Sequence, residues 1–340
     1  MKIWIDILTP KQLLFSEFII KKLSKNNEII CTSRSYNEVS KLSQIRKFNV
    51  IFVGKHGGGW KSTKFNAHLD RMKKLSPLIT KFSPDLTISF CSPEAARISF
   101  GLGIKHVAFC DSPHAEAVMR LTLPLIQKLL IPWIIPKKEF GKYGIESKNI
   151  IQYKAIDAAI TIKRQVTKKQ DLNFKKSNKK RILIRMDEDQ AAYSSKSTKI
   201  VPIIKKIIEE FSEENIIILG RYSEQVKKLK KLFGGKPQIL RMSYDGKFLL
   251  KSIDVFIGSG GTMTAESALL GIPTISYNAV PNIIENYLVK HNMVTRETNP
   301  QKIVKIIKKY IESSGDQNKK MAKNFLNQME DPVQKLLEII

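Results

Sequence analysis

Short, unbroken apolar runs alternate along this chain with segments of helical periodicity, and this alternation limits the fold more than any other feature. The runs are flanked by polar residues, glycine or proline, which is typical of parallel strands covered on both faces. A helix is predicted over residues 11–25, where leucine, isoleucine and phenylalanine recur at helical spacing. Repeated β–α units predict parallel sheets with right-handed crossovers. The expected strands are IWIDIL (3–8), EIICT (28–32), NVIFVG (49–54), DLTISF (85–90), KHVAFC (105–110), RILIRM (181–186), NIIILG (215–220), QIL (238–240), DVFIG (254–258) and PTISY (273–277).

The alternation stops once and then restarts, which predicts two domains. The interrupting stretch, TIKRQVTKKQDLNFKKSNKK, carries eight basic residues and one aspartate, with almost no apolar period. Because 340 residues suit two domains of ordinary size, we expect an α/β fold with two Rossmann-like domains facing a cleft. Asp331 before Pro332 predicts the start of a last helix that packs back on the first domain. The predicted segments are 1–155 (N-terminal domain), 156–180 (basic linker), 181–325 (C-terminal domain) and 326–340 (C-terminal helix).

A formal net charge of +27, from 58 basic and 31 acidic residues, predicts an anionic partner. Phosphorylated substrates, an anionic membrane surface and nucleic acid are the classes to consider, although many lysines also fit solvated helix faces. Nucleic acid is disfavoured, because no helix-turn-helix, RNA-recognition or zinc signature is present and aromatic residues are only 8%. The apolar stretch 120–138 is interpreted as a core strand and its flanks, with peripheral membrane contact through Trp133 as the alternative.

The cysteines and the N-terminal residues indicate the compartment. The three cysteines form no CxxC pair and no His/Cys cluster, so neither a disulfide framework nor a metal site is expected. The first ten residues do not resemble a signal peptide, and no run reaches the roughly 18 apolar residues that span a bilayer. We therefore expect a cytoplasmic protein, with peripheral membrane contact as the alternative.

The most informative motif is a glycine-rich turn between a strand and a helix. The strand that ends near Ile257 runs into Gly258 and the residues Ser259, Gly260, Gly261 and Thr262, and a helix follows. Glycines let a backbone approach a phosphate closely, and a helix N-terminus offers N–H groups and partial positive charge. The motif matches neither the dinucleotide-binding fingerprint nor the P-loop. It predicts phosphate binding, with a tight turn and a side-chain-capped helix as the alternative.

Two charged residues of the second domain accompany this turn. Glu266 lies in the helix seven residues after Ser259, where a carboxylate can pair with the two hydroxyls of a ribose. The alternative is a surface glutamate in a favourable helical position. Arg185 follows the first strand of the second domain and is expected to point toward the ligand.

The first domain offers a polar loop after the strand KHVAFC. Asp111 and His114 are three residues apart, and a histidine beside a carboxylate is the arrangement that a general base needs. Glu116 is a further acid–base candidate, and Arg120 is a candidate ligand of an anion or acceptor. The alternative is a capping aspartate, a solvent-facing histidine and ordinary helix charges.

Two other loops of the first domain hold weaker candidates. Lys55 and His56 precede three glycines, in a loop that can close over an anionic ligand or can be a long turn. Glu94 follows Ser92 and Pro93, so most of this segment is interpreted as helix-start chemistry, with Glu94 as an acceptor ligand as the alternative.

Several segments together resemble known families. The pattern SGGT followed by a glutamate and LLGIP resembles the nucleotide-sugar site of GT-B glycosyltransferases and of non-hydrolysing UDP-N-acetylglucosamine 2-epimerases. The whole chain is similar to the domain of unknown function 354 family. The segments that carry this second resemblance are MKIWIDI (1–7), VGKHGG (53–58), SPEAARISFGLGI (92–104), DSPHA (111–115), RLTLPL (120–125), GSGGTMTAESALLGIP (258–273) and DPVQKLL (331–337).

The resemblance implies a function that the residues alone do not give. The SGGT turn would hold a diphosphate and Glu266 a ribose, while loops of the first domain would hold the acceptor or reacting sugar. The sequence LTPKQLLF departs from related chains, which often carry a histidine or second proline there.

We therefore expect a GT-B glycosyltransferase that uses a nucleotide-diphosphate sugar and an acceptor not identified by the sequence, without a metal or other cofactor. The alternatives are a sugar-nucleotide 2-epimerase, which needs Asp111, Glu116 and Glu94 to converge, and a non-enzymatic protein that binds an anionic surface or nucleic acid.

Overall fold

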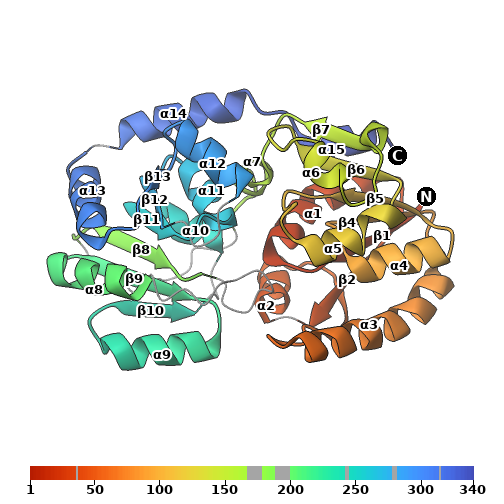
Figure 1. Cartoon of the computed structure of the whole chain (residues 1–340), viewed down its shortest axis with the longest axis horizontal. Helices are drawn as coiled ribbons and strands as arrows, with labels where there is room; N and C mark the ends of the chain where they lie inside the picture. The colour runs from red at the N-terminus through yellow and green to blue at the C-terminus, as the bar shows by residue number, and fades with distance from the viewer. Residues whose placement is uncertain (36, 167–177, 188–199, 242–244, 278–281, 314) are drawn as a thin grey trace. The chain divides into compact units, whose positions relative to one another are not determined.

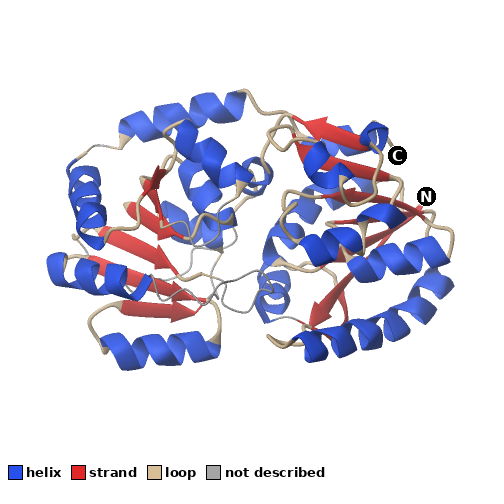
Figure 2. Cartoon of the chain, in the orientation of Figure 1, coloured by secondary structure: helices blue, strands red, loops and turns tan. Residues whose placement is uncertain are grey.

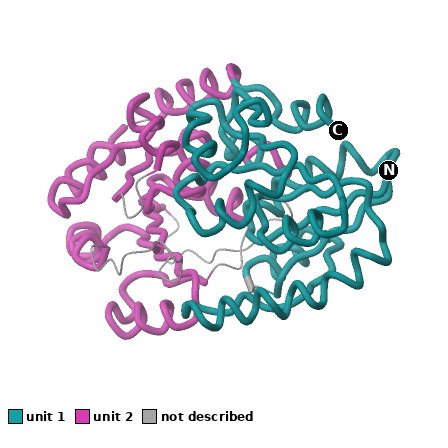
Figure 3. Tube along the Cα trace, turned by 45° about the vertical axis from the view of Figure 1, so that its right-hand side comes forward, with its two compact units in different colours: residues 1–161, 329–340 teal, residues 162–328 magenta. Residues whose placement is uncertain are grey.

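The chain forms two compact units, which are coloured separately in Figure 3. The computed structural model describes all residues except 36, 167–177, 188–199, 242–244, 278–281 and 314. Unit 1 contains Met1–Thr161 and Met329–Ile340, and unit 2 contains Ile162–Gln328.

A seven-stranded parallel sheet forms the centre of unit 1 (Figure 1). The first strand lies inside the sheet, and its inner residues are completely buried because both faces are covered by helices. The strands are β1 (Lys2–Ile7), β2 (Glu28–Ser35), β3 (Ile51–Lys55), β4 (Leu86–Ser89), β5 (Lys105–Phe109), β6 (Lys128–Pro132) and β7 (Ile150–Tyr153). Their order is β3-β2-β1-β4-β5-β6-β7, so the direction of winding reverses between β1 and β4. Ligands of open α/β sheets bind at the carboxyl ends of the strands beside such a reversal.

Helices cover both faces of this sheet (Figure 2). The first helix buries Leu13, Phe15 and Ile19 in the core, and the hydroxyl of Thr9 caps its N-terminus. The helices are α1 (Pro10–Leu23), α2 (Asn37–Arg46), α3 (Lys61–Phe82), α4 (Pro93–Gly101), α5 (Glu116–Arg120), α6 (Lys138–Gly141), α7 (Asp157–Thr161) and α15 (Pro332–Leu337), with 3-10 turns at Leu123–Leu125 and Ser147–Asn149.

The last residues of the chain belong to unit 1. Asp331 caps α15 by accepting a hydrogen bond from the Val333 amide at 2.9 Å, with Pro332 at the first helical position. Val333 and Leu336 are fully buried in the core that α1 also covers.

Unit 2 contains a six-stranded parallel sheet of related topology. The strands are β8 (Arg181–Arg185), β9 (Asn215–Gly220), β10 (Gln238–Arg241), β11 (Val255–Gly258), β12 (Thr274–Ser276) and β13 (Thr295–Arg296). The order β10-β9-β8-β11-β12-β13 again reverses after the first strand, between β8 and β11. The helices are α8 (Ile200–Glu210), α9 (Ser223–Phe233), α10 (Gly246–Lys251), α11 (Thr262–Leu269), α12 (Ile283–Lys290), α13 (Pro300–Glu312) and α14 (Asp316–Asn327).

The segment predicted as a basic linker, 156–180, differs from an exposed linker in its first part. Residues 167–177 of that segment lie outside the described residues. The residues of α7 are all buried, and the division between the units falls after Thr161. Composition concealed this, because all eight basic residues of the stretch lie beyond α7.

The apolar stretch 120–138 lies in the core of unit 1. Its centre forms β6, where the last four residues are buried between β5 and β7. The interpretation as a core strand is therefore correct. No helix in the described part of the chain is long and apolar enough to cross a membrane.

Candidate functional site

The glycine-rich turn of unit 2 has a backbone shape that requires glycine. Gly260 has φ +93°, and a Cβ there would lie 3.1 Å from the Glu285 side chain. A Cβ on Gly258 would lie 2.6 Å from the Thr264 hydroxyl, which instead accepts a hydrogen bond from the Gly260 amide at 3.2 Å. The Asn282 side chain donates to the Gly260 carbonyl at 2.9 Å. The turn is thus fixed by its own helix and by the start of α12.

The N-terminus of α11 is open next to this turn. Gly261 is the N-cap residue, and no side-chain hydrogen bond from the described residues caps the helix there. A Cβ on Gly261 would contact nothing within 4 Å, and both Gly261 and Thr262 are exposed. The alternative of a helix capped by Ser259 or Thr262 is therefore not what the structure contains. An uncapped N-terminus with accessible backbone is suited to an anion.

Glu266 is buried and paired with an arginine, so the alternative of a surface glutamate is wrong. Arg164 donates to the Glu266 carboxylate at 3.1 Å and to the Asp245 carboxylate at 3.2 Å. The exposed fractions of these side chains are 1% for Arg164 and Asp245 and 7% for Glu266. Gly246 borders this ion pair, because a Cβ there would lie 3.7 Å from Arg164 Nη2 and 4.0 Å from Glu266 Oε2.

Arg185 lies at the end of β8, where its guanidinium is held by neighbouring backbone. It donates to the carbonyls of Leu219 and Gly220 at 3.4 and 3.2 Å. The Tyr277 hydroxyl donates to the Arg185 carbonyl at 3.2 Å. Burial raises the pKa of Tyr277, and a hydrogen bond with Ser259 offsets part of that rise. The ends of β8, β11 and β12 are therefore joined beneath the glycine-rich turn.

In unit 1, Asp111 is engaged by a lysine that the sequence analysis did not single out. Lys11 Nζ lies 2.6 Å from Asp111 and 2.9 Å from Asp157, and the Ser112 hydroxyl donates to Asp111 at 2.8 Å. Burial favours the neutral acid, but the charge of Lys11 and the hydrogen bonds from Lys11 and Ser112 together outweigh burial and lower the pKa of Asp111. Tyr153 donates to Asp157 at 2.5 Å. Burial raises the pKa of Asp157, and Lys11 opposes that shift.

The remaining candidates of this loop lie at the surface. His114 is exposed, and partial desolvation lowers its pKa. The charge of Asp111 raises this pKa and the charge of Lys11 lowers it, and the net shift is downward. Glu116 and Arg120 form an ion pair with each other at 2.8 Å, with exposed fractions of 61% and 64%. The structure therefore brings Asp111 and His114 near each other but directs Glu116 to a different partner.

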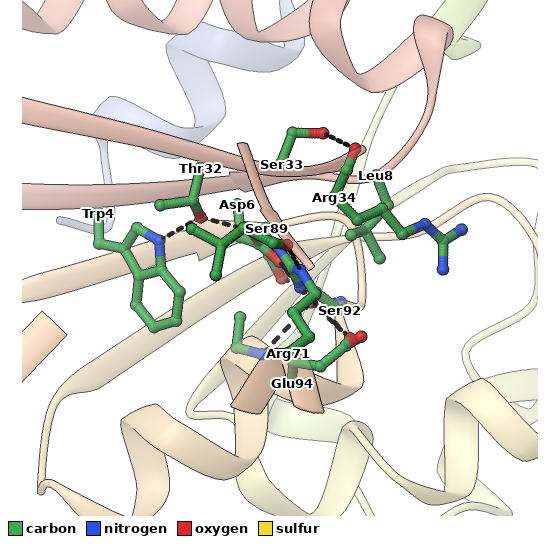
Figure 4. Close-up of polar contacts among 12 residues, drawn as sticks. Trp4, Asp6, Leu8, Thr32, Ser33, Arg34, Arg71, Ser89, Ser92 and Glu94 are labelled. Carbon is green, nitrogen blue, oxygen red and sulfur yellow. Dashed lines mark hydrogen bonds and ion pairs between the residues drawn. The ribbon is translucent and has the colours of Figure 1, made fainter. Parts of the chain in front are cut away.

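Glu94 belongs to a separate buried network, shown in Figure 4. Arg71 donates to both oxygens of Asp6, at 3.1 and 2.5 Å, and its Nη1 lies 3.6 Å from the Glu94 carboxylate. His68 Nδ1 lies 3.4 Å from the other oxygen of Glu94. Burial alone would raise the pKa of Glu94, but His68 and Arg71 lower it to about 2. The helix-start interpretation of Ser92 is correct, because its hydroxyl accepts from the Ala95 amide.

The network of Figure 4 also holds the end of β3, which carries Lys55 and is followed by His56. Arg71 Nε donates to the Val53 carbonyl at 3.1 Å, and a Cβ on Gly54 would lie 2.8 Å from the Arg71 Cβ. Lys55 is exposed and His56 is half-buried, both just beyond this fixed point. Lys55 and His56 thus follow a backbone segment that Arg71 holds by a hydrogen bond.

Two residues of these sites escaped the sequence analysis. Lys11 was visible as a lysine directly after the helix-opening Pro10, an unusual place for a cation because the helix dipole disfavours it. Arg164 was hidden in the basic run assigned to a linker. Among the described residues, no group of three or more His, Cys, Asp or Glu side chains is placed to hold a metal ion.

Two parallel sheets of this topology, each with helices on both faces, define two Rossmann-like domains of the GT-B kind. The chain belongs to the family described as "Protein of unknown function (DUF354)", whose model matches residues 1–340. The uncharacterized protein MJ0665 of Methanocaldococcus jannaschii is 26% identical over 313 residues, which cover 90% of each chain.

Solved structures share the fold over almost the whole length. The UDP-GlcNAc 2-epimerase from Neisseria meningitidis bound to UDP-GlcNAc has a TM-score of 0.74 at 16% identity, with 99% of each chain covered. The spinosyn rhamnosyltransferase SpnG complexed with thymidine diphosphate has a TM-score of 0.61 at 11% identity, also with 99% of each chain covered. These similarities confirm the predicted fold class.

Proposed function

We propose that this protein is a glycosyltransferase of GT-B architecture that uses a nucleotide-diphosphate sugar. The observation that carries the proposal is the combination in unit 2 of an uncapped helix N-terminus with a buried, arginine-held Glu266 one to two turns further along the helix. The first feature suits a diphosphate and the second a ribose diol. The ligands printed for the similar structures, UDP-GlcNAc and thymidine diphosphate, support this class of donor.

In this proposal the diphosphate leaves from the α11 N-terminus. Backbone amides and the positive end of the helix stabilise the charge that develops on the leaving oxygen. The hydroxyls of Ser259 and Thr262 add hydrogen bonds. Arg164 holds Glu266 so that its carboxylate accepts from the ribose hydroxyls.

Unit 1 would supply the acceptor side and the base. The acceptor oxygen forms a bond to the anomeric carbon as the bond from that carbon to the diphosphate oxygen breaks, and the hydroxyl proton passes to a base. His114 suits this role, because its lowered pKa keeps the imidazole neutral near pH 7, and the charge of Asp111 stabilises the imidazolium that forms.

A sugar-nucleotide 2-epimerase is the second candidate, favoured by the similarity to the Neisseria meningitidis epimerase. The carboxylates that it would use engage different partners: Asp111 with Lys11, Glu94 with Arg71, and Glu116 with Arg120. That separation supports a transferase. Incubation of a nucleotide sugar alone, followed by proton NMR, distinguishes the two, because only an epimerase produces the epimer without an acceptor.

The first test is nucleotide binding by thermal shift, with UDP, GDP, dTDP, CMP, NAD and ATP. We expect one diphosphate nucleotide to raise the melting temperature at millimolar concentration, because a ligand of the native state stabilises it. Glu266→Gln should abolish that increase, while Glu224→Gln, an exposed glutamate in the first turn of α9, should retain it. No stabilisation by any nucleotide, or equal stabilisation of both variants, would contradict the donor site.

A further inference from the structure

A lysine–aspartate pair at the carboxyl edge of the unit 1 sheet has the properties of a ligand site. Lys11 and Asp111 are both 17% exposed and lie 2.6 Å apart, so they are partly desolvated but reachable. Asp157 is 2% exposed and lies behind Lys11 at 2.9 Å. The pair thus presents an ammonium group and a carboxylate side by side, with a second carboxylate that holds the ammonium in place.

Three strands contribute to this cluster. Lys11 follows β1, Asp111 follows β5 and Asp157 follows β7, each just beyond the carboxyl end of its strand. The cluster therefore lies along the edge of the sheet where open α/β folds bind their ligands, on the side of β1 where the winding reverses.

Stability alone gives little reason for this arrangement. A buried ion pair contributes about as much as well-packed apolar residues of the same volume, and often less. Lys11 also lies in the first turn of α1, where the helix dipole disfavours a cation. The charges of Asp111 and Asp157 offset this unfavourable interaction with the helix dipole and hold the Lys11 ammonium group in place.

The buried network of unit 1 provides a contrast. Arg71 and Asp6 have exposed fractions of 0%, and Arg71 is also bonded to backbone. That network is closed to ligands and serves to fix β1, β3 and α3. The Lys11–Asp111 pair differs because both of its side chains are partly exposed.

We propose that Lys11 and Asp111 bind the vicinal diol of a carbohydrate, with Asp157 as a positioning residue for Lys11. The ammonium donates to one hydroxyl oxygen, and the carboxylate accepts from the neighbouring hydroxyl. Adjacent donor and acceptor groups match a diol, in which each hydroxyl both donates and accepts. The assignment of this carbohydrate as the acceptor rests on the proposed function, whereas the binding itself does not.

Saturation-transfer NMR with a panel of methyl glycosides, differing in the configuration of their vicinal hydroxyls, tests the proposal on the full chain. We expect at least one glycoside to bind at millimolar concentration, and Asp111→Asn to weaken it about tenfold or more, because a charge-assisted hydrogen bond is lost. Lys11→Met leaves two carboxylates without their cation, so the double variant Lys11→Met/Asp157→Asn, which removes both charges of the buried pair, is the safer test of the lysine.

The control is Lys142→Met, which removes one side of the exposed Lys142–Glu139 pair. It should bind the glycoside as the wild type does. Absence of any glycoside signal in the wild type, or equal binding by wild type, Asp111→Asn and the double variant, would overturn the proposal. Nucleotide stabilisation is measured on the same variants and depends on unit 2, so failure of glycoside binding is distinguished from failure of the donor site.

Discussion

Replacement of Arg164 by methionine should destabilise unit 2 strongly. Arg164 is the cation between Asp245 and Glu266, and all three side chains are at least nine-tenths buried. Removing one partner from a buried pair costs about 3–5 kcal/mol, because the remaining charge is left without compensation. For a domain of this size each kcal/mol lowers the melting temperature by about 2–4 °C, so we expect a decrease of about 6–20 °C.

The positions of the tryptophans make it possible to assign this loss of stability to one of the two units. Its three tryptophans, Trp4, Trp60 and Trp133, all belong to unit 1. Tryptophan fluorescence therefore follows unit 1, whereas far-ultraviolet circular dichroism follows both units. Thermal or urea unfolding of Arg164→Met should shift a circular dichroism transition to lower temperature or denaturant while the fluorescence transition moves less.

Two variants decide whether the ionic cluster is the reason. Arg164→Met/Asp245→Asn/Glu266→Gln removes all three charges and should recover most of the lost stability, because no buried charge is left unpaired. Lys308→Met removes one side of an exposed ion pair with Glu210 and should cost less than about 1 kcal/mol. If Arg164→Met costs no more than Lys308→Met, or if the triple variant is less stable than the single one, the reasoning is refuted.

Three further predictions concern single sites. Gly260→Ala should lower the free energy of unfolding by more than about 1 kcal/mol, because φ is +93° and the new Cβ would lie 3.1 Å from the Glu285 side chain. Gly261→Ala places its Cβ in open space and should change the melting temperature by only about a degree or two, so equal effects of the two substitutions would contradict this account. Glu94→Gln should lower the free energy of unfolding by about 3 kcal/mol at pH 7, since folding lowers the pKa of Glu94 from 4.5 to about 2. The carboxylate stabilises the fold above pH 4.5, and this stabilisation disappears as the pH falls toward 2, so a pH-independent difference in urea unfolding would count against the prediction. Burial lowers the pKa of His106 to about 3, so the free energy of unfolding of the wild type should fall as the pH drops from 6.5 to 3. In the same urea titration His106→Leu should depend less on pH, and an equal pH dependence of the two proteins would show that His106 is not the cause.

The strands of the two sheets were predictable because parallel strands buried on both faces must be almost wholly apolar. All ten expected strands correspond to strands of the structure. The strand β7 was missed because its four residues include Gln152, which interrupts the apolar run and whose side chain donates to two backbone carbonyls. The two-residue β13 is too short to leave a periodic signal.

The candidate sites divide in the same way between local and distant causes. The glycine-rich turn could be predicted because its conformation depends on residues adjacent in sequence, and glycine announces a positive φ. The partners of Glu266 and Asp111 could not, because Arg164 and Lys11 are each about a hundred residues away and meet them only in the folded unit. In a lysine-rich sequence, a buried and paired basic residue cannot be distinguished from the solvated ones, because its acidic partner is adjacent only in the folded protein.

The return of the chain to unit 1 after unit 2 makes unit 2 an insertion with two covalent attachments. Val333 and Leu336 fill space in a core whose other members are synthesised before the whole of unit 2. On the ribosome, the core of the first sheet therefore lacks these two side chains until unit 2 has been synthesised, while unit 2 can complete its own core before α15 exists. A stop of translation between unit 2 and α15 would therefore leave the core of unit 1 incomplete, although unit 1 was the first to be synthesised, and would leave the core of unit 2 intact.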